Sequence, residues 1–159
     1  MGVAKEKGQT YKSEAFTVKV LPEGRLPGKS IGLDIRSPDE LIEKLNKGFA
    51  TDTFDILRRE LGVTVERLIE LIDISRKTLD RRKKIRRFGE AESERVYRYA
   101  KLFDLAKDLF GGDRKKARKW FHAPNISLGG ETPLDYAKTE PGAQIVEDLI
   151  IRLEYGEIA

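Results

Sequence analysis

The sequence predicts an all-α protein, because residues that start helices recur at short intervals and apolar residues follow them at helical spacing. The candidate caps are Ser37, Thr51, Thr64, Ser75 and Asp113. Glycine follows several of the apolar stripes, as it does after many helix C-termini. Alternation with a period of two residues, which is typical of strands, occurs within residues 16–20 and 31–35.

The composition is that of a soluble chain with one domain or two small ones. Of 159 residues, 39% are hydrophobic and 36% are charged, and the net charge is +4. The absence of cysteine excludes disulfides and thiolate metal sites. No apolar run approaches the ~20 residues of a membrane span, and the N-terminus lacks the apolar core of a signal peptide. We therefore expect a cytoplasmic protein with no membrane partner.

The chain divides into three predicted segments: an N-terminal extension (residues 1–36), a helical body (37–112) and a small C-terminal domain (113–159). Residues 1–12 are polar and are predicted to be a loose end. Two short strands are predicted in the rest of the extension, one with Phe16, Val18 and Val20 and one with Ile31, Leu33 and Ile35. An isolated two-stranded ribbon is barely stable, so we expect it to lean on the helical body or on another subunit.

Five helices are predicted in the helical body. The first begins at Ser37 in a capping box with Glu40, and Pro38 occupies its first position. The others are expected at about residues 51–62, 65–72, 76–84 and 90–110. Their core-facing residues are predicted to include Phe54, Leu57, Leu61, Leu68, Leu79, Val96, Tyr99, Phe103 and Ala106.

Two of these helices have the proportions of a helix-turn-helix, at about residues 65–84. Only Asp73, Ile74 and Ser75 join them, and the second helix is short, capped and basic. Residues 76–87 contain eight Lys/Arg and one acid. A solvated, charge-rich helix face is the alternative explanation. The tight helix pair, the near absence of acids and the inward Leu79 favour contact with DNA.

The placement of the basic residues suggests their roles on DNA. The N-terminal residues of a recognition helix meet base edges, which makes Arg76, Lys77 and Thr78 the candidates for base readout, with Arg81 one turn further along. Ser75 and the helix N-terminus are positioned to take a phosphate. The residues expected to neutralise the DNA backbone are Arg82, Lys83, Lys84, Arg86 and Arg87.

The C-terminal domain is dense in turn and cap residues. A helix capped by Asp113 is expected to run through Trp120 and Phe121, which we assign to the core, and to end before Pro124. Turns, a short helix and a last helix follow; the residues that mark them are Asn125, Gly129, Gly130, Thr132, Pro133 and Thr139.

Ile151 lies outside the core-facing stripe of the last helix, which indicates a second buried surface. A dimer interface and a foreign partner remain equally open. Residues 123–159 contain seven acids and two bases.

Four motifs occur in a specific order within residues 120–156: W-F-x-x-P-N-x-x-L-G-G-x-T-P-L-D at 120–135, T-x-x-G at 139–142, V-x-x-L at 146–149 and R-L-x-Y-G at 152–156. In order and spacing they resemble the C-terminal toxin-binding domain of antitoxins of the Xre/MbcA/ParS type. Upstream, I-S-R-K-T-L-D-R-R at 74–82 and S-E-R at 93–95 are similar to the Xre-like helix-turn-helix of the same proteins.

This resemblance implies an antitoxin of a RES–Xre type II toxin–antitoxin system. The partner would be a RES-domain toxin that consumes NAD⁺, and the antitoxin would block the way to its active site. The complex would repress its own operon by binding operator DNA, and the antitoxin would self-associate, with a dimer expected. By position, the implied toxin-binding residues are Asn125, Gly129, Gly130, Thr132, Pro133, Glu147, Arg152, Glu154, Tyr155 and Ile158. The acidic tail of this chain would complement the NAD⁺ pocket of the toxin, because that pocket must attract a dinucleotide that carries phosphates.

An enzyme is not expected. The single histidine, His122, has no cysteine partner and stands at a helix end, where a structural role is the simpler explanation. No phosphate-binding glycine motif is present, so we predict no catalytic residue, no metal site and no cofactor. The alternative function is a stand-alone helix-turn-helix regulator whose C-terminal domain only dimerises or senses a ligand. A RES-type reading frame beside the gene, and co-purification of its product, would separate the two.

Overall fold

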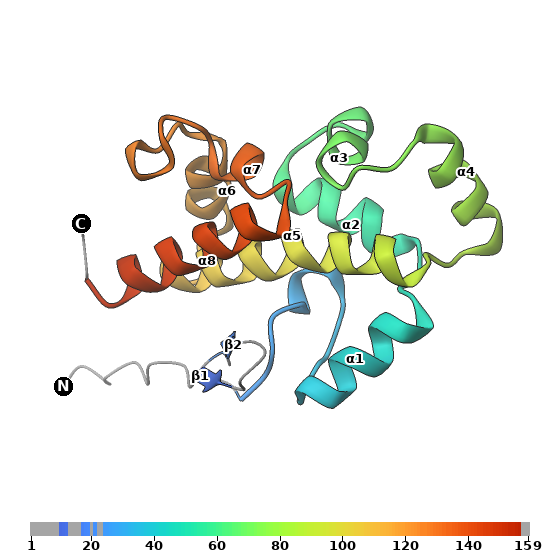
Figure 1. Cartoon of the computed structure of the whole chain (residues 1–159), viewed down its shortest axis with the longest axis horizontal. Helices are drawn as coiled ribbons and strands as arrows, with labels where there is room; N and C mark the ends of the chain where they lie inside the picture. Colours follow the sequence, from blue (N-terminus) through green and yellow to red (C-terminus); the bar gives the residue numbers. More distant parts are fainter. Residues whose placement is uncertain (1–9, 13–16, 20, 22–23, 157–159) are drawn as a thin grey trace.

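The computed structural model describes residues 10–12, 17–19, 21 and 24–156, and this part of the chain is organised around one long central helix, α5 (Figure 1). Helices α1, α2, α6 and α8 and the 3-10 helix η1 all pack against α5. The helices are η1 (Lys29–Ile31), α1 (Pro38–Lys47), α2 (Asp52–Leu61), α3 (Val65–Leu71), α4 (Arg76–Ile85), α5 (Glu90–Leu109), α6 (Arg114–His122), η2 (Ile126–Leu128), α7 (Pro133–Tyr136) and α8 (Glu140–Glu154). The all-α prediction is confirmed, and none of these helices is long and apolar enough to cross a membrane.

One continuous core joins the helical body to the C-terminal segment. Tyr99 and Phe103 of α5 are fully buried, and so are Phe54 of α2, Phe121 of α6 and Ile150 of α8. The Phe103 and Phe121 rings lie 6.0 Å apart, centroid to centroid. Trp120 is only half-buried and meets the Phe121 ring edge-on. The body and the C-terminal segment therefore share apolar contacts along α5.

Local capping explains most of the helix starts. Six predicted cap side chains each accept a hydrogen bond from the backbone N–H three residues further on; they are Ser37, Thr64, Ser75, Asp113, Thr132 and Thr139. Thr51 occupies the cap position of α2, but its side chain makes no capping bond. Instead the hydroxyl of Thr53 donates to the carbonyl of Ala50 at 2.7 Å.

The N-terminal extension differs in part from its prediction. Strands β1 (Thr10–Lys12) and β2 (Thr17–Lys19) form an antiparallel ribbon in which Tyr11 stands opposite Val18. β2 confirms the middle of the first predicted strand, whereas Phe16 and Val20 lie outside the described residues. β1 falls in a segment that was expected to be a loose end, and for residues 10–12 that expectation is wrong.

The second predicted strand is also wrong, because residues 26–35 form a looped segment held on α5. The amide of Leu33 donates to the carbonyl of Gly28 at 3.0 Å, which folds η1 into a turn, and Ile35 forms only one isolated bridge, with Leu26. The buried carboxylate of Asp104 accepts the amide of Gly28 at 2.6 Å. Ile31 and Ile35 are both buried against the helical body. Their alternation in the sequence therefore reflects burial and not a strand.

Candidate functional surfaces

Helices α3 and α4 form the predicted helix-turn-helix, and α4 projects from one end of the long axis of the molecule (Figure 1). The turn between them is closed by the amide of Ile74, which donates to the carbonyl of Ile69 at 3.2 Å. Asp73 takes a left-handed backbone conformation (φ 51°), which Asp tolerates better than most residues. Leu79 is the only buried residue of α4. The helix thus has one apolar anchor, and most of its other side chains are exposed.

The predicted DNA-binding residues divide by exposure. Ser75, Arg76, Lys77, Arg81, Lys84 and Arg86 are exposed, whereas Thr78 and Arg82 are half-buried. Arg76 forms exposed ion pairs with Glu66 (3.4 Å) and Asp80 (3.5 Å). Ion pairs this exposed contribute little stability, so the guanidinium of Arg76 can exchange them for a phosphate or a base.

Three of the residues assigned to the DNA backbone are engaged within the fold. The Nε atom of Arg82 lies 2.9 Å from the nearly buried carboxylate of Glu92. Lys83 pairs with Asp55 at 3.3 Å, and Arg87 donates to the carbonyls of Lys47 (3.1 Å) and Gly48 (2.9 Å). The basic residues of α4 and its C-cap that remain available to a ligand are therefore Arg76, Lys77, Arg81, Lys84 and Arg86.

The predicted turn region forms a compact loop, residues 125–131, at the other end of the molecule (Figure 1). The amide of Asn125 donates to the carbonyl of Glu131, and the amide of Gly130 donates to the carbonyl of Asn125, both at 3.0 Å. The side chain of Asn125 caps η2 by accepting the amide of Ser127 at 2.9 Å. Gly129 and Gly130 have φ values of 66° and 87°, in the left-handed region that glycine adopts without strain.

The predicted toxin-binding residues of α7 and α8 and their flanking positions differ in exposure. Arg152 and Tyr155 are exposed, Glu154 and Thr132 are half-buried, and Pro133 is buried. Ile158 lies outside the described residues. Glu147 does not lie on the surface as its assignment to toxin contact requires: it is 2% exposed, and its carboxylate meets the Nζ atom of Lys101 on α5 at 2.8 Å.

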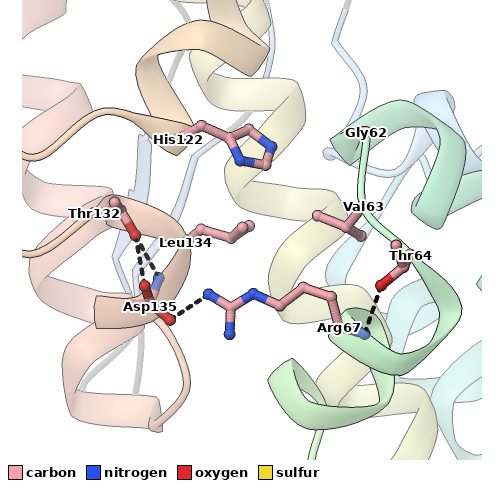
Figure 2. Close-up of a pocket in the computed structure, with 8 residues that line it drawn as sticks. All are labelled: Gly62, Val63, Thr64, Arg67, His122, Thr132, Leu134 and Asp135. Atoms are coloured by element: carbon pink, nitrogen blue, oxygen red, sulfur yellow. Dashed lines mark hydrogen bonds and ion pairs between the residues drawn. The ribbon is translucent and has the colours of Figure 1, made fainter.

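A cavity of about 360 Å³ lies where α7 approaches the turn between α2 and α3 (Figure 2). It is lined by Gly62, Val63, Thr64, Arg67, His122, Thr132, Leu134 and Asp135. In Figure 2 the side chain of Arg67 reaches across this space toward Asp135. The Nε2 atom of His122 lies 2.7 Å from the carbonyl of Leu61, which gives the histidine a structural contact to the end of α2.

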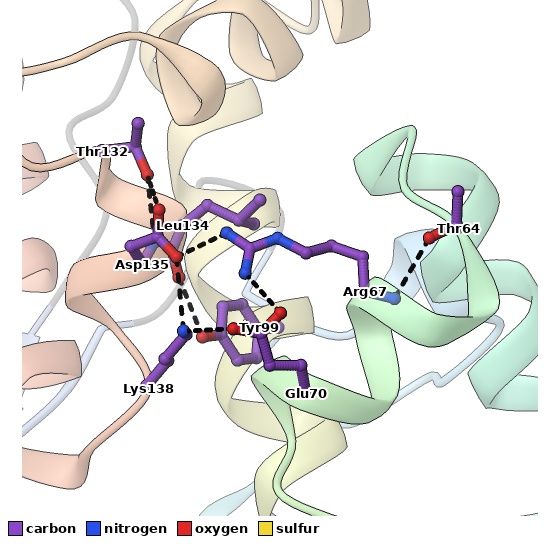
Figure 3. A network of polar contacts seen from close by, with 8 residues as sticks. All are labelled: Thr64, Arg67, Glu70, Tyr99, Thr132, Leu134, Asp135 and Lys138. Atoms are coloured by element: carbon purple, nitrogen blue, oxygen red, sulfur yellow. Dashed lines mark hydrogen bonds and ion pairs between the residues drawn. The ribbon is translucent and has the colours of Figure 1, made fainter. Parts of the chain in front are cut away.

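Four charged side chains form an ionic ring between α3 and α7 (Figure 3). Arg67 pairs with Asp135 and, at 2.9 Å, with Glu70. Lys138 completes the ring, 2.8 Å from Glu70 and 3.5 Å from Asp135. Beneath the ring, the hydroxyl of Tyr99 donates to the carbonyl of Leu134 at 2.9 Å. The ring was not predicted, because 68 residues separate Arg67 from Asp135.

The ring shifts the pKa of each of its members toward the charged form. Partial burial opposes the ionised form of Asp135, but the hydrogen bonds from Arg67 and Thr132 outweigh it and hold the pKa of Asp135 below its usual value. Hydrogen bonds from Lys138 and Arg67 likewise lower the pKa of Glu70. The pKa of Lys138 is raised, chiefly by its hydrogen bond to Glu70.

The lowered pKa values predict how the stability of the fold depends on pH. The ring's contribution to the free energy of unfolding is fully present above the ordinary carboxyl pKa values, 4.5 for Glu70 and 3.8 for Asp135. It is lost as the pH falls through the lowered values. We expect the free energy of unfolding in urea to fall less steeply from pH 6 to pH 3 in Glu70→Gln/Asp135→Asn than in the wild type. The control Glu94→Gln/Asp148→Asn, which changes two exposed carboxyls outside the ring, should follow the wild type. Parallel curves for all three proteins would rule out the ring as a contributor.

Comparison with known proteins finds a matching family domain for each of the two segments that carry these surfaces. Residues 40–101 match the antitoxin Xre-like helix-turn-helix domain, and residues 105–156 match the antitoxin Xre/MbcA/ParS C-terminal toxin-binding domain. The chain is 36% identical over 129 residues to the antitoxin Xre of Yersinia enterocolitica, covering 80% of this chain and 87% of the relative. It is 30% identical over 132 residues to the antitoxin Xre of Photorhabdus laumondii, covering 82% and 89%. The chain belongs to the Xre family of antitoxins.

Proposed function

We propose that this antitoxin binds a RES-domain toxin, stops its consumption of NAD⁺ by covering the approach to its active site, and represses its own operon as a DNA-bound homodimer in the cytoplasm. The observation that carries the proposal is the separation of two surfaces. The basic helix α4 lies at one end of the molecule, and the loop at 125–131 and the C-terminal end of α8 lie at the other (Figure 1). One chain therefore has room for both partners at once.

The DNA-binding part of the proposal rests on the exposed cations of α4. Five of these cations are exposed and make no contact within the described residues that holds them in the fold, and Leu79 is the one buried residue of the helix. Each cation that neutralises a phosphate releases counterions, so the affinity for DNA must depend on salt. Since Arg82, Lys83 and Arg87 serve the fold, the number of phosphate contacts from α4 should not exceed about five per subunit.

The logarithm of the affinity for operator DNA should fall with the logarithm of salt concentration at a slope of roughly −4 to −5 per subunit. The double variant Lys77→Ala/Arg81→Ala should weaken binding by about tenfold or more and make the slope shallower by about 2, in fluorescence-anisotropy titrations. The control is Lys115→Ala/Lys116→Ala, which removes two exposed cations from α6. Loss of binding in the α6 variant, with the α4 variant intact, would move the DNA-binding surface to α6.

The toxin-binding part rests on the exposed residues at the C-terminal end of α8 and on the loop at 125–131. Arg152 is exposed near the end of α8. Removing the whole helix is a poor test, because Val146, Leu149 and Ile150 of α8 belong to the core. A truncation after Thr139 would unfold the protein along with any binding site, so surface substitutions are needed.

Arg152→Glu should weaken binding of the toxin by about tenfold or more, since it reverses the charge of an exposed arginine in the proposed interface. The measurement is whether the purified product of the reading frame beside the gene consumes NAD⁺, and how much antitoxin is needed to stop that consumption. Lys119→Glu, a charge reversal at an exposed position of α6, is the control and should neutralise like the wild type. Failure of the wild-type antitoxin to slow NAD⁺ consumption would refute the proposed function itself.

A further inference from the structure

Ile126 is far more exposed than any other large apolar side chain in the described part of the chain. Its side chain is 96% exposed, whereas the next is Ile85 at 62%, followed by Ile42 at 47%. Scattered exposed apolar residues are ordinary on protein surfaces. An isoleucine with almost no contact to its own protein is different, because the fold gains nothing from its apolar character.

The loop that carries Ile126 is already ordered in the free protein. Three further backbone hydrogen bonds reinforce those of Asn125: the amide of Leu128 donates to Asn125 (3.0 Å), that of Gly129 to Ile126 (3.2 Å) and that of Glu131 to Leu128 (3.3 Å). Leu128 is 3% exposed and anchors the loop in the core. A rigid loop loses little conformational entropy when it binds, so an apolar group at its tip is well placed to add affinity.

None of the contacts that build the loop needs an apolar side chain at position 126. Asn125 supplies the cap, Leu128 the anchor, and Gly129 and Gly130 the left-handed turn. A polar residue at position 126 would keep every one of these bonds and would be better solvated. The isoleucine is therefore explained by something outside the chain.

We propose that Ile126 is an anchor that inserts into an apolar pocket on the toxin and helps to determine which toxin the antitoxin accepts. This inference rests on the proposed function and adds a contact to it. The loop belongs to the segment that matches the toxin-binding domain and lies at the end of the molecule opposite α4 (Figure 1). An exposed apolar side chain on a preformed loop has the character of a binding hot spot.

The matched domain favours the toxin over the other occupants of this surface. The loop lies within residues 105–156, which match a toxin-binding domain. Residues 125–131 contain one acid, Glu131, and no base, so the loop itself carries no cation to attract a DNA phosphate. The apolar tip thus fits a partner protein with an apolar recess.

The test compares Ile126→Ala and Ile126→Glu with Ile85→Ala and Ile85→Glu, in which the second most exposed isoleucine is changed at the end of α4. The full-length antitoxin is titrated against a catalytically inactive form of the RES-domain toxin of the proposed function. We expect about tenfold weaker binding for Ile126→Ala and about a hundredfold or more for Ile126→Glu. The Ile85 variants should bind the toxin like the wild type, and the melting temperatures of all four should be unchanged.

The outcomes separate this inference from the proposed function. If the wild type does not bind the toxin, both fail. If the wild type binds and both Ile126 variants stay within about twofold of it, the anchor is refuted and the proposed function stands. If Ile126→Glu changes the oligomeric state in light scattering while toxin affinity stays the same, a second copy covers Ile126, and the inference is wrong in that case too.

Discussion

The fold depends on the burial of α5 against helices from both halves of the chain. Tyr99 and Phe103 belong to a single cluster of buried apolar residues that also contains Phe54 of α2, Phe121 of α6 and Ile150 of α8. Close-packed interiors transmit positional constraints, because shifting one buried side chain disturbs all its neighbours. The orientation of the C-terminal segment relative to the helix-turn-helix is therefore set by this packing, and the ionic ring of Arg67, Glu70, Asp135 and Lys138 fastens the same two parts at the surface.

The two proposed working surfaces are peripheral to that core. α4 is attached through Leu79, and the loop at 125–131 is attached through Leu128. Each surface has one apolar anchor, and its exposed residues make few demands on the fold. Substituting the exposed residues of either surface is therefore expected to cost little stability.

Sequence reasoning succeeded where the deciding contacts are local. Ser37, Thr64 and Ser75 cap their helices through bonds that span three residues, and such bonds leave a readable pattern. The loop at 125–131 was anticipated from its asparagine and glycines for the same reason. The strand predicted at 31–35 failed because its alternation was overridden by distant partners, among them Asp104, which binds the amide of Gly28.

The candidate site was harder to predict than the fold, since its charges find partners far away in the sequence. Arg82 and Lys83 were assigned to DNA, but Glu92 and Asp55 hold them within the fold. Glu147 was assigned to the toxin, although a signal against this was present: it lies four residues after Ala143 and three before Ile150, on the core-facing side of α8. Its partner Lys101 on α5 became visible only in the structure.

We propose that one chain holds DNA and toxin at opposite ends without competition. The most direct measurement is the mass of the complex formed when operator DNA, the wild-type antitoxin and the inactive RES-domain protein are mixed, determined by sedimentation or light scattering. Two separate surfaces predict a single species that contains all three components. Displacement of the DNA as the toxin is added, at every ratio of the two proteins, would mean that the surfaces overlap and would contradict the account.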